Sequence, residues 1–363
     1  MSTLTTLQEM FLLNISSNAG SSQSGDNITQ KVFARIADNL KNNGLANWEI
    51  AWGPGVYTAM SGTTPDNVIY LARDKTTNRY FLSVAGTNAY SIIDWIEDFD
   101  TGGTSQWPYI IGTDVQVANG SLNALNILTA LTGQACVNGI STGAPVLLST
   151  YLQQTLGAAA PASFALITGG HSLGGALAPL LALWLNDTKA VWDPNKAVSG
   201  IACWPCAGPT AGTKSFQTYY NARVPDTTRI HNTLDVVPHA WNMADLKKIP
   251  LLYNPAIGRS DCVDWFVGRC EGKVAGIDYE QAGLTDEALT GTVNTSIVRS
   301  LLPAGINFGL QLDYQHVKAY YDLLGLNASM SFLFESSLAE RVAYWAGVAA
   351  STRVHTRSYT VMA

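Results

Sequence analysis

The segment GHSLGG at 170–175 places a serine, Ser172, between two glycines. A serine on a sharp turn between a strand and a helix has crowded backbone neighbours. Glycines two residues before and two residues after it relieve that crowding. Such a turn exposes the hydroxyl to a cleft and points the positive end of the next helix at a developing oxyanion. The pattern therefore predicts Ser172 as the nucleophile of an acyl-transfer reaction.

The same spacing occurs a second time, around Ser141, in the segment GISTG at 139–143. No convincing strand precedes Ser141, and Pro145 disfavours a helical conformation at Ala144. We interpret Ser141 as part of a loop that leads to a helix beginning near Pro145. Because a strand-like run precedes Ser172 and an apolar helix follows it, the context favours Ser172 over Ser141.

A serine hydroxyl needs a histidine to take its proton and a carboxylate to orient that histidine. On a turn of this kind the chain order is serine, then acid, then histidine. Four histidines follow the serine: His231, His239, His316 and His355. Chain order alone leaves all four in competition.

The elements that would position these side chains alternate between strand and helix. The runs 67–74 and 79–86 are rich in β-branched and aromatic residues, and the turn-like KTTN between them predicts a hairpin. Further strands are expected at 163–170, 199–208 and 227–237, and helices at 124–131, 145–156, 175–187 and 216–222. Alternation from about residue 120 predicts an α/β architecture with a mainly parallel sheet.

Composition sets broader limits. The 363 residues are 47% hydrophobic and 13% charged, which allows a sizeable core and excludes global disorder. A net charge of −6 argues against nucleic acid as a partner. No apolar run approaches the roughly 18 residues of a membrane span. Residues 15–28 are polar, so we expect 1–30 to be a flexible N-terminal arm.

The location of the protein stays open. The first residues lack the basic and apolar regions of a secretory signal, although the low charge leans weakly towards a secreted protein. The cysteine count of five is odd, so at least one is unpaired. Cys262 and Cys270 bracket a short loop and form a candidate disulfide in an exported protein. Cys203 and Cys206 lie in one strand, so we expect buried free thiols on opposite faces.

Several motifs together resemble the class 3 lipases, the fungal-type triacylglycerol lipases. Between residues 67 and 325 they follow the family's order: AGT at 85–87, DWIED at 94–98, VANG at 117–120, GHSLGGA at 170–176, GP at 208–209 with Gly212, NTLDVVP at 232–238 and YQHVKAY at 314–320. The resemblance implies a single α/β-hydrolase domain, with a mainly parallel central sheet flanked by helices and a lid helix.

Position by position, the resemblance implies Ser172 as nucleophile, Asp235 as acid and His316 as base. Asp235 read by itself would also fit an ordinary turn aspartate before a proline, and His316 a polar residue at a helix start. The backbone N–H groups of Leu173 and Thr87 would form the oxyanion hole. His231 and His239 flank Asp235 and are expected beside the site or on the surface.

The sequence departs from the family in three places. Ala85 replaces the usual arginine, Ala118 replaces the histidine of V-H-x-G, and two positions are inserted between Thr87 and Trp95. These departures leave the implied triad intact.

Two segments bear on the substrate. Residues 88–107 mix apolar and acidic residues at amphipathic spacing, which is typical of a lid but also of a surface helix. Residues 243–305 are expected to form an insertion or cap between acid and base. With Trp241 before them, they are apolar enough to wall an acyl pocket.

The resemblance implies a serine carboxylester hydrolase, with a lipase acting on acylglycerol esters at a lipid–water interface as the first expectation. A short-chain, phospholipid or feruloyl-type esterase is the alternative on the same fold. A non-catalytic lipid-binding protein is the alternative of another class. No metal-site cluster is visible, and this chemistry needs no cofactor.

Overall fold

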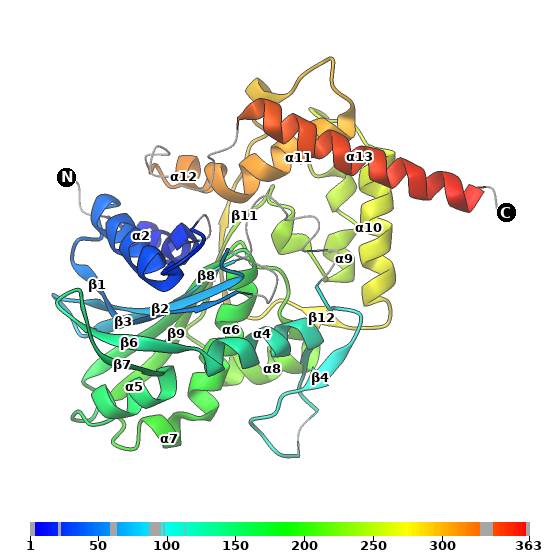
Figure 1. The fold of residues 1–363 in the computed structure, drawn as a ribbon. Helices are drawn as coiled ribbons and strands as arrows, with labels where there is room; N and C mark the ends of the chain where they lie inside the picture. Colours follow the sequence, from blue (N-terminus) through cyan, green and yellow to red (C-terminus); the bar gives the residue numbers. More distant parts are fainter. Residues whose placement is uncertain are drawn as a thin grey trace.

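The computed structural model describes residues 4–20, 23–58, 64–86, 96, 99–112, 114–326 and 337–360, with the side chains of 351–360 left out. At its centre lies a nine-stranded sheet in the order β13-β11-β9-β8-β3-β2-β1-β6-β7 (Figure 1). Its strands are β1 (Trp48–Tyr57), β2 (Asn67–Asp74), β3 (Arg79–Val84), β6 (Thr132–Val137), β7 (Ile140–Leu147), β8 (Phe164–His171), β9 (Val198–Cys206), β11 (Thr228–Asn232) and β13 (Thr285–Leu289).

The sheet has a parallel half and an antiparallel half. Strands β3, β8, β9, β11 and β13 run parallel to one another. From β3 outward, β2, β1, β6 and β7 pair antiparallel, and the β2–β3 hairpin is as predicted. The expectation of a mainly parallel sheet is therefore correct only for the half that carries Ser172. Short connections join β1 to β2, β2 to β3 and β6 to β7 and force antiparallel pairing there, whereas β6 joins β1 only after a long connection. Helical crossovers permit the parallel pairing of the other half.

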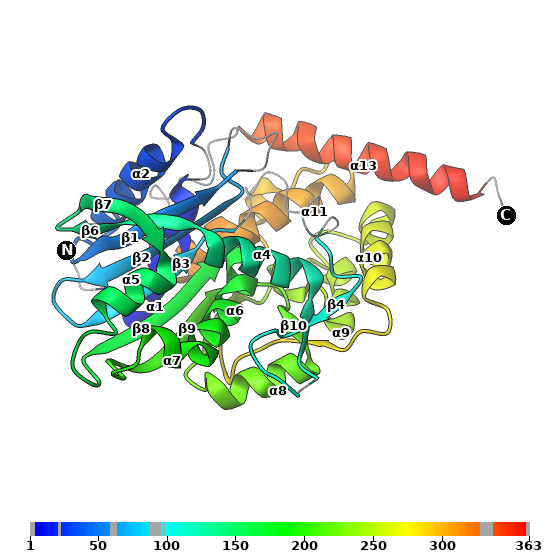
Figure 2. The ribbon, with the colours of Figure 1, turned by 60° about the horizontal axis from the view of Figure 1, so that its bottom comes forward.

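Helices cover both faces of this sheet (Figures 1 and 2). One face carries α4 (Asn119–Ala130), α5 (Leu148–Thr155), α6 (Leu173–Asp187) and α8 (Lys214–Arg223). The other face carries α1 (Thr6–Ser16), α2 (Ile28–Asn42) and α12 (Ala319–Leu323). Alternation along β3 separates the two cores, because Leu82 packs with the first group and Phe81 with the second.

The N-terminal segment is not a flexible arm over residues 4–20, so this prediction is wrong there. Thr5 and Gln8 form a reciprocal capping box at the start of α1. The rest of α1 and the short helix η1 (Ser17–Gly20) are buried from Met10 onward. Polar residues of the 15–28 segment that suggested a solvated arm are bonded inside the protein; Ser16 Oγ, for example, donates to the carbonyl of Leu12 at 2.7 Å.

A second, four-stranded sheet lies beside the first. Its strands are β4 (Thr104–Gln106), β5 (Gln116–Ala118), β10 (Gly212–Thr213) and β12 (Tyr279–Glu280). Short helices follow the strands at α7 (Lys189–Trp192), η3 (Val237–His239), α9 (Met243–Leu246), η4 (Ile249–Leu251) and η5 (Thr295–Ile297). Because β12 and β13 fall within residues 243–305, part of the expected cap is built into the two sheets.

The C-terminal part is helical. It comprises α10 (Asp261–Val274), α11 (Ala304–Asp313), a π-helix (Tyr314–Lys318), α12 and α13 (Leu338–Thr360). Helix α13 crosses α11 and extends past the rest of the molecule (Figures 1 and 2). Trp345 of α13 packs against Gly309, and its Nε1 donates to Asp313 at 2.9 Å. Among the described residues, no helix is long and apolar enough to cross a membrane.

No disulfide joins any of the five cysteines, all of which lie in the part of the chain that the structure describes. Cys262 and Cys270 belong to one helix, α10, where eight residues separate their Cα atoms by about 12 Å. A disulfide needs less than about 7 Å, so the suggested pairing is wrong. Cys203 and Cys206 are buried on opposite sides of β9, as predicted. Burial raises the pKa of the Cys203 thiol to about 12.

Candidate active site

Ser172 occupies the sharp turn between β8 and α6. It adopts φ 63° and ψ −127°, an uncommon conformation for a residue with a side chain, and it is 4% exposed. A Cβ atom on Gly170 would lie 2.5 Å from the carbonyl oxygens of Val84 and Gly174, and one on Gly174 would meet Val84 even more closely. The two glycines therefore relieve real crowding at Ser172, as the motif predicts.

Gly175 also has a steric role. A Cβ atom there would lie 2.7 Å from the Cα of Gly208 and would also meet the carbonyl oxygen of Cys206. The glycine thus lets α6 approach the end of β9 closely, which fixes the direction of the turn at Ser172.

Ser141 lies on strand β7 and not in a loop, so that interpretation is wrong; α5 begins only at Leu148. The hairpin β6–β7 forms because Asn138 and Gly139 adopt the positive φ values of a tight turn. Ser141 pairs with Cys136 and is exposed at the sheet edge, with its Oγ 3.8 Å from the Sγ of Cys136.

Asp235 lies in a turn three residues beyond the end of β11 and is completely buried. Its backbone N–H donates to the carbonyl of Asn232 at 2.9 Å. Its carboxylate accepts hydrogen bonds from the N–H of Val237 at 3.0 Å, from the hydroxyl of Tyr320 at 2.8 Å and from His316 Nδ1 at 2.9 Å. Three donors satisfy the charge in place of water.

His316 lies in the π-helix and is 1% exposed. Because a carboxylate only accepts, the proton of the imidazole sits on Nδ1, which faces Asp235. This leaves Nε2 with a lone pair, and Nε2 is buried without a hydrogen-bond partner. The ring centre of His316 lies 4.7 Å from that of His171, the residue before Ser172. Sequence-distant Asp235 and His316 are thus in contact, beside the turn that carries Ser172.

Tyr320 is a site residue that sequence reasoning missed. Its hydroxyl donates to Asp235 and accepts from the N–H of Asn232 at 2.9 Å. Burial and the charge of Asp235 raise the pKa of Tyr320 well above its usual value, so it stays a phenol. The available signal was its position four residues after His316, which places both side chains on one helix face.

The expected oxyanion donors are only partly described. Leu173 begins α6, and a Cβ on Gly86 would lie 3.3 Å from its backbone nitrogen, so the end of β3 passes beside Leu173. Asn18 of η1 accepts from the N–H of Gly86 at 2.9 Å and holds this strand end. Thr87 lies outside the described residues.

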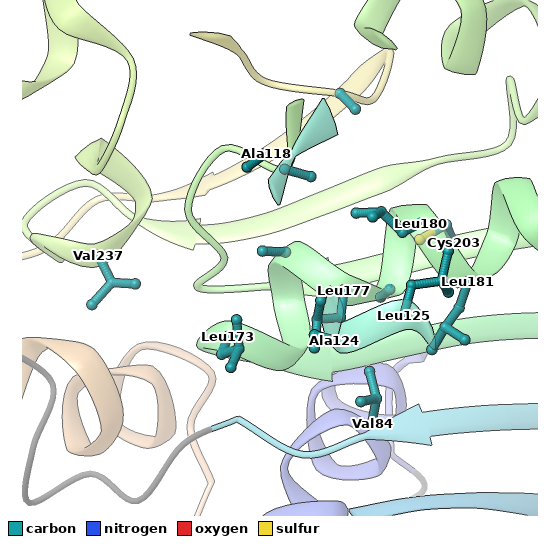
Figure 3. Close-up of a cluster of buried hydrophobic side chains, with 14 of the residues drawn as sticks. Val84, Ala118, Ala124, Leu125, Leu173, Leu177, Leu180, Leu181, Cys203 and Val237 are labelled. Carbon is teal, nitrogen blue, oxygen red and sulfur yellow. The ribbon is translucent and has the colours of Figure 1, made fainter. Parts of the chain in front are cut away.

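Much of the expected lid, residues 88–95 and 97–98, also lies outside the described residues. Ile96 is buried, and the ring of Phe99 stacks on Trp241 with centroids 4.9 Å apart. Leu173, Leu177 and Leu180 line the start of α6 within an apolar cluster that includes Val84, Ala118 and Val237 (Figure 3). Ala118, which replaces the family's histidine, is thus part of the core.

Of the other candidate histidines, His231 and His239 do not contact the carboxylate of Asp235. His231 Nδ1 lies 3.0 Å from Asp286, and His239 Nδ1 lies 2.8 Å from the backbone oxygen of Asp235. The side chain of His355 is outside the described residues. Nor does the described part of the chain hold a cluster of three histidine, cysteine or acidic side chains suited to a metal ion.

The chain is similar to known lipases. The family model described as Lipase (class 3) matches residues 81–244. A structure of M37 lipase is 27% identical, with 93% of this chain and 100% of that chain covered and a TM-score of 0.78. Comparison with curated protein sequences gives no match.

More distant similarity extends to lipase II from Rhizopus niveus, at 18% identity, a TM-score of 0.45, and coverage of 66% of this chain and 76% of that chain. The triacylglyceride lipase of Rhizomucor miehei gives 20% identity, a TM-score of 0.44, and coverage of 66% and 75%. Both TM-scores are below 0.5, so neither similarity supports a conclusion about this chain.

Proposed function

We propose that this chain, which matches the class 3 lipase model over residues 81–244, is a carboxylic ester hydrolase of the α/β-hydrolase fold that cleaves acylglycerol esters through an acyl-enzyme on Ser172. The contact between Asp235 and His316 carries this proposal. It fixes the tautomer of His316 and leaves Nε2 free to accept a proton next to the turn of Ser172.

The proposed reaction has two halves. Ser172 Oγ attacks the ester carbonyl while Nε2 of His316 takes its proton, and Asp235 stabilises the resulting imidazolium. The N–H groups of Leu173 and Thr87 stabilise the tetrahedral oxyanion, each by on the order of 3 kcal/mol. The alcohol leaves with the proton from His316. A water molecule then releases the acid by the same steps and restores Ser172.

We propose acylglycerols presented at a lipid–water interface as the substrate class. Apolar side chains surround the turn at Ser172, and Phe99, within the segment expected to be the lid, stacks on Trp241. Buried apolar side chains beside the nucleophile suit the acyl chain of a lipid ester. An esterase for short-chain, phospholipid or feruloyl esters is the outcome that a substrate series would reveal instead.

The test compares Ser172→Ala with Ser141→Ala on p-nitrophenyl esters of increasing chain length, with and without an emulsified interface. We expect Ser172→Ala to lose at least about 10⁴-fold in kcat and Ser141→Ala to match the parent. Ester hydrolysis retained by Ser172→Ala would refute the assignment. Preference for short chains without a gain at the interface would reject the lipase in favour of the esterase. No hydrolysis by the parent at all would favour the non-catalytic lipid-binding alternative.

A further inference from the structure

Two side chains donate to neighbouring backbone carbonyls of the π-helix that carries His316. His171 Nε2 lies 2.9 Å from the carbonyl oxygen of His316 itself. Asn232 Nδ2 lies 2.9 Å from the carbonyl oxygen of Gln315. His171 is the last residue of β8, and Asn232 is the last residue of β11. The donors thus come from the two strand ends that lead into Ser172 and Asp235.

The protonation of His171 follows from its surroundings. The side chain is 1% exposed, and burial, which penalises the charged imidazolium, holds the pKa of His171 well below its usual value. His171 is therefore neutral and has one N–H group. Since a carbonyl oxygen only accepts, that proton lies on Nε2 and is directed at His316.

The side chain of Asn232 also has fixed hydrogen-bond partners. It is fully buried, and its Nδ2 also donates to the side-chain oxygen of Gln315 at 2.7 Å. The amide of Gln315 in turn donates to the carbonyl of Thr292 at 2.8 Å. Gln315 is fixed on both sides, so the turn next to His316 cannot rotate without breaking several buried hydrogen bonds, each costly to leave unmade.

We propose that His171 and Asn232 are positioning residues that clamp the π-helix of His316 to the strand ends carrying Ser172 and Asp235. The proposal rests on the proposed function, because it concerns the base of the same triad. Neither residue exchanges a proton in the reaction. Their effect is to hold Nε2 of His316 within reach of Ser172, where a displacement of about 1 Å costs on the order of 100-fold in rate.

Other charged and titratable groups also face His316. Asp235 and Tyr320 contact each other beside its Nδ1, and Asp313 precedes the π-helix, where Arg341 and Trp345 hold it. Cys206 lies near Asp235, but burial raises its pKa well above the usual value, so it stays a neutral thiol. His171 also packs edge-on against the ring of Tyr320, with centroids 5.9 Å apart, and Asn232 Oδ1 accepts from the N–H of Leu234 at 3.1 Å, next to Asp235. The side chains of His171 and Asn232 make none of the hydrogen bonds of Asp235, Tyr320 and Asp313 given above.

The test uses three substitutions at His171 in the full-length protein. Glutamine can place an N–H close to the position of Nε2, asparagine has the same amide but is too short, and phenylalanine has no donor. We expect His171→Phe and His171→Asn to lower kcat by about 10-fold to 100-fold with KM nearly unchanged. His171→Gln should recover most of kcat. If His171→Phe fails to fold, the contrast between glutamine and asparagine still decides.

Thr168→Val is the matched control. Thr168 lies on the same strand β8, is buried, and its hydroxyl donates to the carbonyl of Ala178 at 3.2 Å, away from His316. Its loss should lower Tm without changing kcat. If the His171 variants change only Tm, as Thr168→Val does, or if glutamine is no better than asparagine, the positioning role is wrong.

Asn232→Leu provides a second measurement. Because both donors hold one segment, its effect on kcat should be less than additive with that of His171→Phe in a double-mutant cycle. Full additivity would contradict a shared clamp. Ser172→Ala separates the two hypotheses: if it stays active, the proposed triad fails. If it is inactive while His171→Phe and Asn232→Leu keep the parent's kcat, only the clamp fails.

Discussion

The two G-x-S-x-G segments of this chain use their glycines for different reasons. At the β6–β7 hairpin, Gly139 and Gly143 adopt φ values of 73° and 72°, and an added Cβ would meet nothing within 4 Å. At the turn of Ser172 the strained φ belongs to the serine, and the flanking glycines are needed because backbone crowds them. One segment needs glycine for conformation and the other for space, although their letters match.

The largest expected effect concerns the acid–base pair, which distinguishes the surroundings of Ser172 from those of Ser141. Asp235→Asn should lower kcat by about 10⁴-fold, because an amide favours the wrong tautomer of His316. Steady-state hydrolysis of a p-nitrophenyl ester measures this. Asp286→Asn, at the pair with His231, is the control and should retain kcat. Equal losses in both variants would remove Asp235 from the triad.

The glycines themselves give the next largest difference. Gly174→Ala should destabilise the fold by about 3 kcal/mol or more, since its Cβ would collide with the backbone of Val84. Gly143→Ala should cost only about 1–2 kcal/mol, the usual cost of a side chain at positive φ. Denaturant unfolding of both variants measures the contrast. Similar losses would mean that space is not what separates the two segments.

The residue before Ser172 is the buried His171, whereas the residue before Ser141 is the exposed Ile140. The burial of His171 predicts that the folded protein loses stability in acid. The pKa of His171 is lower in the folded protein than in the unfolded chain, where it is about 6.5. Below that pH the unfolded chain binds a proton that the folded chain does not. Stability is therefore complete above pH ~6.5 and falls by up to about 1.4 kcal/mol per unit as the pH drops towards the folded pKa.

His171→Gln should flatten this acid-side loss in unfolding curves measured between about pH 6.5 and 4.5. His239, whose pKa burial also lowers, is present in both proteins, so the difference isolates His171. An unchanged slope would show that His171 is not held neutral.

The smallest effect is expected at Ile140, which occupies the corresponding position before Ser141 and is 68% exposed. Ile140→Ser should change stability by no more than about 0.5 kcal/mol and leave kcat unaltered. A large loss in either quantity would mean that the hairpin contributes to the site after all.

The sequence predicts the parts of this site whose local chemistry is distinctive. The turn at Ser172 is recognisable because β8, the glycines and α6 all obey local rules. Asp235 and His316 were found through family motifs, since chain order alone left four histidines. Their contact depends on long-range packing across 81 residues, which no local pattern encodes.

The missed features share a physical cause. Tyr320 and Asn232 are polar residues whose importance comes from complete burial, and burial is a property of the folded chain. The N-terminal helix was missed because its buried asparagines and serines resemble those of a solvated arm. The sequence predicts a loop around Ser141 because β7 is almost entirely exposed and lacks the apolar alternation of a half-buried strand.

Helix α1 packs against parts of the chain that are synthesised at very different times. Its Gln8 donates to the carbonyl of Leu324, 316 residues later, at 2.8 Å, and its Asn14 donates to that of Trp204. The helix also packs against α2 and β3, which follow it closely in the chain, and against β8 and β9, which come later. At ribosomal rates the stretch from α1 to Leu324 takes on the order of 15 s or more to synthesise, so α2 and β3 cover part of the apolar run Met10–Leu13 before its remaining partners exist.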